Sequence, residues 1–321
     1  MASQPITARA IPQGFSFQRA WKSYGIIAIL VVFFIILSIS TESFLSVDNL
    51  INILRQISIL GIVALGLFTT MVSGNVDLSV GSTLGFSSAI LAALSFRIGI
   101  PMAFIVTIIA SLMIGFVNGF FSTRAKGLSI MVTLSMKFII FSATLLITNT
   151  KPIVNLPPSL LVLGKNSIGP IPVPVIILLV VVFLAWAFMS HTVAGRKFYA
   201  VGSNDVAAKF SGLQVKRIQI GAFMITAIAA TVSGIILMGR VVSAQPNAGI
   251  GIEMDAIGAV LIGGASLNGG SGTVRGTVIG VLILGLIANG LNLLGVNPLL
   301  RDGVKGAIIL FAILMDQWGR E

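Results

Sequence analysis

Residues 56–96 read QISILGIVALGLFTTMVSGNVDLSVGSTLGFSSAILAALSF, and this stretch contains one charged residue, Asp77. An apolar window of about 20 residues lies on each side of Asp77, and this is the length that a helix needs to cross the hydrocarbon core of a bilayer. The stretch therefore predicts two membrane-spanning helices joined by a short polar connection.

The same pattern continues along the whole chain. Of its 321 residues, 56% are hydrophobic and 9% are charged, whereas soluble domains carry about 25% charged residues. The sequence therefore predicts an all-α polytopic membrane protein with about ten transmembrane helices. The expected spans are 23–41, 52–73, 78–96, 99–121, 128–149, 172–190, 218–239, 254–268, 276–295 and 300–317.

The net charge of +11 has to be explained before a nucleic-acid partner is set aside. The basic residues cluster in short connections between spans, as the positive-inside rule predicts for cytoplasmic loops, so the charge indicates topology and contact with anionic lipid. An even number of spans places both termini on one side, and the more basic side is the cytoplasm. Residues 1–22 are expected to form a cytoplasmic tail rather than a signal peptide, and residues 23–321 a single transmembrane domain.

Two connections are longer than the others. The first, at about 150–172, falls outside and is expected to be an ordered periplasmic loop. The second, at about 191–217, is cytoplasmic and contains a stretch with the features of a short helix: Asn204 as N-cap, Asp205 in the first turn, and Gly212 as terminator.

A weak internal repeat favours two inverted five-helix halves, an arrangement common in transporters. Three residues recur with the same spacing near the start of two Gly-rich spans: Asp77, Gly85 and Ser88 match Asp255, Gly263 and Ser266. Five spans separate the two sets, so the two copies would run in opposite directions.

Catalytic chemistry and cofactors are not expected in this chain. It has no cysteine and one histidine, His191, which excludes disulfides, thiolate metal sites and a Ser/His nucleophile pair, and predicts no metal site. No P-loop or Rossmann motif occurs, so the chain should not bind ATP itself. Acidic residues near spans lie only at their predicted ends, so a buried proton relay is lacking and the energy for transport should come from a partner.

Polar residues interrupt the apolar windows at 73–82. A broken helix there would expose peptide groups and the side chains of Asn75, Ser79 and Ser82 to a polar ligand. The alternative is an ordinary turn in which Asp77 caps the next helix. Lys137 lies inside an expected span, where snorkelling to the interface is favoured over contact with a polar cavity.

Several segments together resemble a known family. They are 74–82 (GNVDLSVGS, where the family has GGIDLSVGS), 192–196 (TVAGR), 199–204 (YAVGSN), 207–212 (AAKFSG), 243–246 (SAQP), 253–264 (EMDAIGAVLIGG) and 289–295 (NGLNLLG). From about Phe44 to Asp316 the chain resembles the membrane permease subunits of carbohydrate ABC importers of the ribose, xylose and arabinose type, which are related more distantly to branched-chain amino-acid permeases.

This resemblance implies a multi-pass permease of the bacterial cytoplasmic (inner) membrane that translocates a monosaccharide. It implies partners as well: cytoplasmic ABC ATPase subunits that use the ATP, a periplasmic sugar-binding protein, and a second permease copy in a homodimer or related heterodimer. The short cytoplasmic helix becomes the element that fits the ATPase. The coupling-loop residues are then Arg196, Asn204, Asp205, Ala207, Ala208, Ser211 and Gly212.

The resemblance also implies which segments line or gate the pathway. The candidates are Asn75, Asp77, Ser79, Ser82, Gln245, Glu253, Asp255, Asn289 and Asn292. The chain departs from the family pattern at Asn75, where a glycine is usual, and at Phe141, where an arginine is expected and Lys137 lies one turn earlier. Both departures leave the class of protein unchanged and leave the identity of the transported sugar open.

Two alternatives share much of the evidence: a permease for branched-chain amino acids and an ion-coupled secondary transporter. A membrane enzyme acting on lipid-linked substrates is disfavoured because no acid, base or metal groups converge at one interface.

Overall fold

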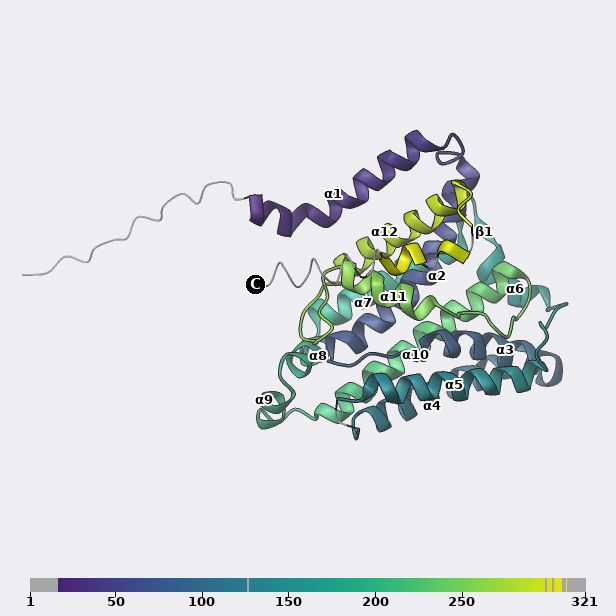
Figure 1. Ribbon diagram of the computed structural model, residues 1–321. Helices are drawn as coiled ribbons and strands as arrows, with labels where there is room; N and C mark the ends of the chain where they lie inside the picture. The colour runs from purple at the N-terminus through teal and green to yellow at the C-terminus, as the bar shows by residue number, and fades with distance from the viewer. Residues whose placement is uncertain (1–16, 126, 298, 302, 308–309, 311–321) are drawn as a thin grey trace, which may run out of the picture.

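The computed structural model describes residues 17–125, 127–297, 299–301, 303–307 and 310, and of residues 17–26 and 29 it describes the backbone alone. The elements are α1 Phe17–Ser40, α2 Val47–Val72, α3 Val80–Ile98, α4 Ile100–Ser122, α5 Ser129–Thr148, α6 Pro158–Lys165, β1 Ser167–Ile168, β2 Ile171–Pro172, α7 Val173–His191, α8 Val193–Ser203, α9 Asp205–Phe210, α10 Val215–Val241, α11 Ile252–Ile262 and α12 Val274–Leu293. Apart from one short hairpin of β1 and β2, the described chain is helical (Figure 1).

Seven helices of the described chain are long and apolar enough to cross a membrane: α2, α3, α4, α5, α7, α10 and α12. They confirm seven of the ten expected spans. The first expected span falls on α1, whose apolar part among the described side chains is Leu30–Ser40. The last, 300–317, lies mostly outside the described residues.

The span expected at 254–268 is wrong in length. α11 has 11 residues, and at 1.5 Å per residue it is about 16 Å long, roughly half the hydrocarbon thickness of about 30 Å. Glycines in the left-handed region flank it, Gly251 at φ 87° before the helix and Gly264 at φ 83° after it, and this conformation interrupts a helix. Apolar composition alone could not show that the backbone turns there.

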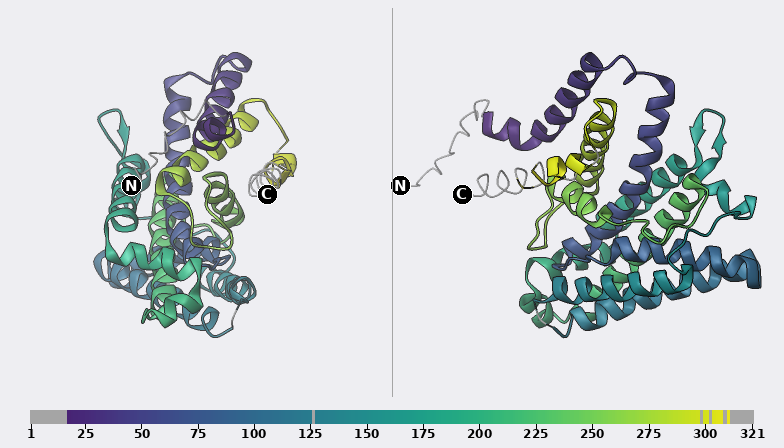
Figure 2. Two further views of the ribbon diagram at one scale, coloured as in Figure 1. Left: turned by 90° about the vertical axis from the view of Figure 1, so that its left-hand side faces the viewer. Right: turned by 45° about the vertical axis from the view of Figure 1, so that its right-hand side comes forward.

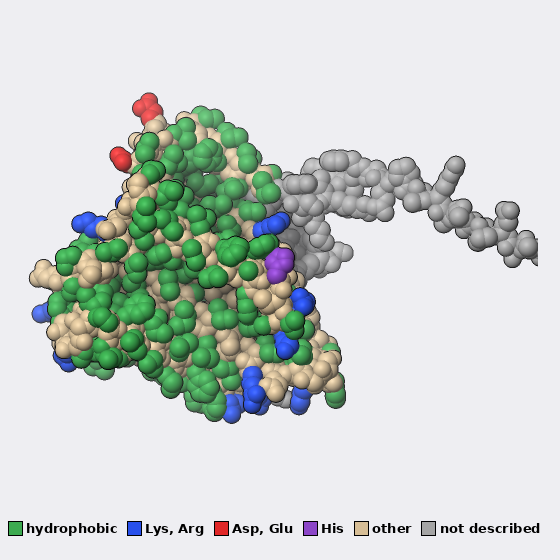
Figure 3. Space-filling model, turned by 180° about the vertical axis from the view of Figure 1, so that it is seen from behind, with side chains coloured by type: hydrophobic (Ala, Val, Ile, Leu, Met, Phe, Trp, Pro, Cys, Tyr) green, Lys and Arg blue, Asp and Glu red, His purple; other side chains and the backbone are tan. Residues whose placement is uncertain are grey.

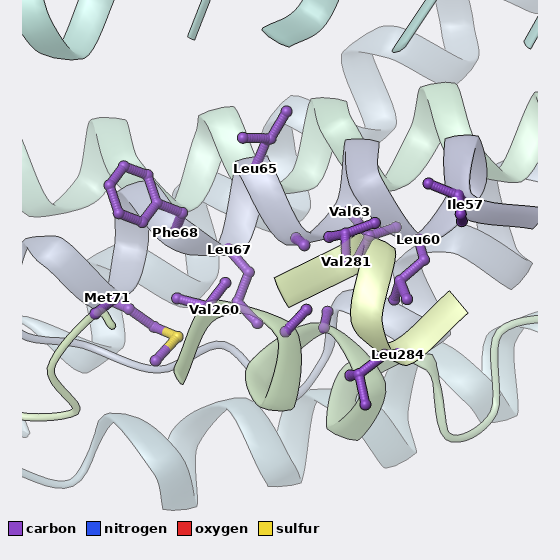
Figure 4. Close-up of a cluster of buried hydrophobic side chains, with 14 of the residues drawn as sticks. Ile57, Leu60, Val63, Leu65, Leu67, Phe68, Met71, Val260, Val281 and Leu284 are labelled. Atoms are coloured by element: carbon purple, nitrogen blue, oxygen red, sulfur yellow. The ribbon is translucent and has the colours of Figure 1, made fainter. Parts of the chain in front are cut away.

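α2 and α10 form the centre of the molecule. α2 packs on α7, α10, α11 and α12, while α10 packs on α2, α3 and α4. Figure 4 shows part of the core where side chains of α2 meet those of two other helices, Leu67 beside Val260 of α11 and Val63 beside Val281 of α12. α1 packs on α12 at the edge of the bundle (Figure 2).

Small and hydroxyl residues bring α10 close to its neighbours. A Cβ on Gly66 of α2 would lie 2.5 Å from the Cβ of Ala229. The hydroxyls of Thr70 and Thr226 are 2.5 Å apart, which joins α2 to α10. Glycine contacts and interhelical hydrogen bonds are the usual means of association in lipid, where the hydrophobic effect does not drive helices together.

The bundle has two ends, which we call the α9 side and the α6 side. The α9 side carries α8 and α9, the last turns of α2 and α7, and the first turns of α10 and α12. The α6 side carries α6 and the hairpin, with the opposite ends of the same helices. On the face shown in Figure 3, the surface between these ends is a broad apolar band, with basic side chains gathered at its edges.

The loop expected at 150–172 is ordered. It contains α6 and the β1–β2 hairpin, and Ile153 forms an isolated antiparallel bridge with Ala244. The loop therefore holds the connection between α10 and α11 in place on the α6 side.

Candidate functional site

The break between α2 and α3 is buried and its backbone is hydrogen-bonded to side chains. The amide of Leu78 donates to the hydroxyl of Thr133 at 3.0 Å, and the Thr133 hydroxyl contacts the carbonyl of Val76 at 3.3 Å. Irregular backbone at membrane depth requires such partners. α5, which carries Thr133, therefore supports the break.

Asp77 organises the polar side chains of this break. Its side chain is 1% exposed, and its Oδ1 accepts hydrogen bonds from the backbone N of Ser79 at 2.8 Å and the Ser79 hydroxyl at 2.7 Å. The amide nitrogen of Asn118 on α4 donates to the same hydroxyl at 2.7 Å. Asp77 thus closes the turn that leads to Ser79, the N-cap of α3, and Asn118 ties α4 to this turn through the Ser79 hydroxyl.

The other polar residues of the break are also enclosed. Asn75, Ser79 and Ser82 are buried, and the Asn75 amide reaches the carbonyl of Ser73 at 3.4 Å. In this conformation the segment is packed in protein rather than open to a solute, so the exposure expected of a broken helix is absent for these three side chains.

Glu253 and Lys137 form a buried ion pair. Lys137 Nζ lies 2.5 Å from Glu253 Oε1, with the side chains 26% and 2% exposed, respectively. Glu253 Oε2 is buried and has no hydrogen-bond partner in the described chain. Lys137 therefore points into the bundle, so the expectation that it snorkels to the interface is wrong.

The connection between α10 and α11 runs back along α3. A Cβ on Gly81 would lie 2.4 Å from both Glu253 Oε2 and the carbonyl oxygen of Gly249, and a Cβ on Gly85 would lie 2.6 Å from the oxygen of Ala248. The structure thus brings the two predicted pathway segments, 73–82 and 245–264, together at Gly81.

The remaining residues of this connection are less enclosed. The amide of Gln245 donates to the Ser243 hydroxyl at 3.3 Å. Asp255 accepts from Lys305 at 2.9 Å, and the two side chains are 26% and 22% exposed. Glu253 and Asp255 both lie in the first turn of α11, where the helix dipole favours carboxylates. They pair with different parts of the chain, Glu253 with Lys137 and Asp255 with Lys305.

The last two candidates, Asn289 and Asn292, lie near the end of α12 on the α6 side. Asn289 on α12 and Asn49 on α2 exchange hydrogen bonds through their side-chain amides, at 2.7 and 3.2 Å. Asn292 is exposed. The Asn49–Asn289 pair joins two helix ends.

The loop at 191–217, expected to be cytoplasmic, contains two helices where one was expected. Thr192 caps α8 by accepting from the amide of Gly195 at 2.9 Å. Asn204 caps α9 by accepting from Ala207 at 2.8 Å, and Gly212 at φ 81° follows the end of α9. The cap and terminator expected from the sequence therefore occupy those positions.

α9 is exposed on its outer edge. Val206 is 58% and Phe210 88% exposed, whereas Ala208 is 5% exposed. Asp205, Lys209 and Ser211 are also exposed, as is Arg196 on α8. A short helix that presents two apolar side chains to water beyond the bundle has the form of a docking element.

A backbone junction joins this loop to the transmembrane helices. A Cβ on Gly202 would lie 1.8 Å from the carbonyl oxygen of Val72, the last residue of α2, and that oxygen accepts from the amide of Gly270 at 2.9 Å. Tyr199 donates to the carbonyl of Gly272 at 3.2 Å, and burial raises the pKa of its hydroxyl. We call the contact of Gly202, Val72 and Gly270 the α8 junction.

Sequence reasoning missed several of these residues. Asn118 and Thr133 are polar residues in apolar spans, a signal that could have suggested a role in satisfying the break. Lys137 and Glu253 are both named from the sequence, but not as a pair, which their opposite charges in apolar segments could have suggested. For Gly202 the sequence offers no comparable signal, because its role depends on a contact with a residue 130 positions away.

The chain is similar to known transport proteins along almost its whole length. A family model described as "Branched-chain amino acid transport system / permease component" matches residues 49–313. The ribose import permease protein RbsC of Escherichia coli K12 is 37% identical over 98% of this chain and 99% of the relative, and that of Bacillus subtilis 168 is 38% identical over 90% of each. The L-arabinose transport system permease protein AraH of Escherichia coli K12 is 31% identical over 99% and 98%. No solved structure shows a significant match.

Proposed function

This chain belongs to the family of permease components of branched-chain amino acid transport systems, and we propose from this membership that it is the transmembrane subunit of an ATP-driven ABC importer for a monosaccharide. The observation that carries the proposal is similarity over nearly the full length to permeases named for ribose and L-arabinose. A branched-chain amino acid is the less favoured substrate, because the relatives named here are sugar permeases. The chain is a transport subunit of the bacterial inner membrane and not an enzyme.

We propose that ATP is used by partner ATPase subunits on the α9 side and that this chain binds no cofactor. The capped helix α9 supports the proposal, because Val206 and Phe210 project from it and could fill an apolar groove of a partner. The α8 junction would pass a movement of α9 to the end of α2. A periplasmic sugar-binding protein on the α6 side and a second permease copy complete the proposed assembly.

We propose ten transmembrane helices in two inverted halves, with both termini cytoplasmic. Helix packing supports the halves, because α4 packs on α3 and α10 just as α12 packs on α11 and α2. The repeat residues themselves do not occupy equivalent positions. Asp77 lies before α3 begins, whereas Asp255 lies inside the first turn of α11, so the packing carries this argument and the three-residue match does not.

The direct test is transport by the complex purified with its own ATPase and reconstituted into liposomes with the cognate binding protein. We expect uptake of radiolabelled D-ribose or L-arabinose that requires ATP hydrolysis. Uptake of leucine in place of a sugar would contradict the substrate class. Accumulation driven by a pH or sodium gradient without ATP would contradict the ABC mechanism.

Disrupting α9 should uncouple ATP hydrolysis by the partner ATPase from substrate transport by this chain. In Ala208→Pro the amide that donates to the carbonyl of Asn204 at 2.9 Å is lost, at a cost of about 3 kcal/mol within a helix. We expect substrate-stimulated ATP hydrolysis to be lost while the permease remains in the membrane, measured by phosphate release and by membrane fractionation.

A proline at the first helical position provides the matched control. Asp205 begins α9, where proline is tolerated because no helical hydrogen bond is lost. Asp205→Pro should therefore have the ATPase activity of Asp205→Ala. Unchanged coupling in Ala208→Pro would count against α9 as the docking element.

A further inference from the structure

We propose that a cavity of about 240 Å³ on the α6 side of this chain is the site that first accepts the monosaccharide during import. This inference rests on the proposed function and adds to it a site within one copy of the chain. The polar groups around the cavity are Gln56, Arg240, Asp255 and Lys305. Its volume lies just below the range of about 300–1,000 Å³ for pockets that hold drug-sized ligands, and it suits a single sugar ring.

The cavity lies at the end of the bundle from which an imported solute would enter. Gln56 is in the third turn of α2, Arg240 is in the last turn of α10, and Ala288 is near the end of α12. These ends are on the α6 side, opposite α8 and α9. Gln56 and Ile250, which is 63% exposed, lie at the cavity wall, so the cavity opens at the surface of this chain.

The polar groups around the cavity match the hydrogen bonds that a sugar can form. Asp255 accepts, Arg240 and Lys305 donate, and the Gln56 amide does both, as sugar hydroxyls also do. A guanidinium presents several donors in a fixed plane, which can engage two neighbouring oxygens. Among the described residues no ion pair is formed by Arg240, so its donors remain available to a ligand.

The rest of the wall is aliphatic. Leu60, Leu237, Ile252 and Leu284 line it, and these side chains can cover the C–H face of a sugar ring. Among the described residues, none of those that line the cavity is aromatic and able to stack on the ring, so we expect weak binding. Weak binding suits a transport site, because a solute has to leave as well as enter.

The inner part of the wall belongs to the segment that runs back along α3. Gly249, Ile250 and Ile252 line the cavity, and Gly249 is in direct contact with Gly81. Glu253, the next residue, is held by Lys137 on α5. The cavity and the buried ion pair therefore lie on opposite sides of one short segment, and a movement of this segment would open the cavity toward the α9 side.

A thiol introduced into the cavity can report its occupancy, because the chain has no cysteine of its own. Ala288→Cys places the thiol in the wall, and Ser159→Cys, on an exposed position of α6, is the matched control. The complex with its ATPase is labelled by a membrane-impermeant maleimide with and without D-ribose or L-arabinose. At a sugar concentration of three times Kd, we expect the labelling rate of Ala288→Cys to fall about fourfold and that of Ser159→Cys to stay the same.

A second variant tests the polar wall. The side chain of Gln56 is exposed and has no hydrogen bond with other described residues, so Gln56→Leu should fold normally. In the Ala288→Cys background it should raise the sugar concentration that gives half-maximal protection about tenfold, the effect of losing one good hydrogen bond. At the sugar concentration used above, protection would then fall from about fourfold to about 1.3-fold. Asp255→Asn should act in the same direction but also loses the ion pair with Lys305.

The possible outcomes distinguish a failure of the proposed sugar site from a failure of the proposed transport function. Sugar transport by the complex without any protection of Ala288→Cys would overturn the site and leave the proposed function intact. Equal protection of Ser159→Cys, or a cysteine at 288 that does not react even without sugar, would overturn the site as well. Leucine uptake without sugar uptake would overturn the proposed function itself.

Discussion

Replacing Gly202 with alanine is expected to stop transport and the coupling of ATP hydrolysis to it. The new Cβ would lie 1.8 Å from the carbonyl oxygen of Val72 and 2.7 Å from the amide nitrogen of Gly270. Both are backbone atoms, so the overlap can be relieved only by separating α8 from α2. We expect a loss of about 3 kcal/mol in the free energy of unfolding, the upper part of the range for overpacking, or a displaced α8.

Stability and coupling can be measured separately for this variant. Thermal unfolding of the detergent-solubilised complex reports stability, and substrate-stimulated ATP hydrolysis in proteoliposomes reports coupling. A variant that stays folded but hydrolyses ATP at the same rate with and without substrate would show that the α8 junction transmits movement between α9 and α2.

Gly221 supplies the matched control. It is also a helical glycine, in α10, and a Cβ there would have no heavy atom within 4 Å. Gly221→Ala should be neutral or stabilising by up to about 1 kcal/mol, because alanine has the higher helix propensity. Equal behaviour of the Gly202 and Gly221 variants would exclude a special role for the junction.

The second large effect is expected at the Lys137–Glu253 ion pair. Removing one partner of a buried pair leaves an uncompensated charge and costs about 3–5 kcal/mol. Lys137→Met should be the more damaging change, because Glu253 is 2% exposed and cannot reach water. Glu253→Gln should cost less, since Lys137 is 26% exposed and its long side chain can snorkel.

The double variant Lys137→Met with Glu253→Gln tests whether the two residues act on each other. It should recover most of the stability lost in Lys137→Met, because both charges are then absent. Thermal unfolding of the four proteins in detergent gives the coupling energy. Additive losses in the double variant would show that the two residues act independently.

Much of the fold could be predicted from the sequence because the membrane imposes a length and a composition on each span. The helices over 47–72 and 215–241 fall within a few residues of their expected positions. α11 could not be bounded in this way. Its apolar character continues to Ile262 and beyond, while the backbone on either side of it is fixed by close contacts with other helices, Gly249 with Gly81 of α3 and Gly263 with Gly276 of α12.

The loop at 191–217 also shows what local sequence patterns can and cannot predict. Asn204 and Gly212 mark the ends of α9 as local patterns predict, since caps depend on neighbours in sequence. α8 was not predicted, because Gly195 and Gly202 lower its helix propensity. Both glycines are needed for close contacts, Gly195 with Met189 and Gly202 with Val72, and tertiary packing outweighs propensity there.

The candidate pathway residues follow from the resemblance and stay predictions, and their partners could not be predicted from the sequence. The contact of Lys137 with Glu253 spans 116 positions, and Asn289 proved to join Asn49 at helix ends. Only the folded arrangement separates a residue that gates a path from one that holds two helices together.

The central position of α10 has a consequence for biosynthesis. The helices α2, α3 and α4 all pack on α10, but α10 is translated only after residue 215 has been reached. Helices in lipid gain little from the hydrophobic effect and need matching surfaces to associate. We therefore expect the first half of the chain to be inserted in the bilayer before its helices have completed their packing. A polypeptide that ends before α10 would lack the helix on which α2, α3 and α4 pack.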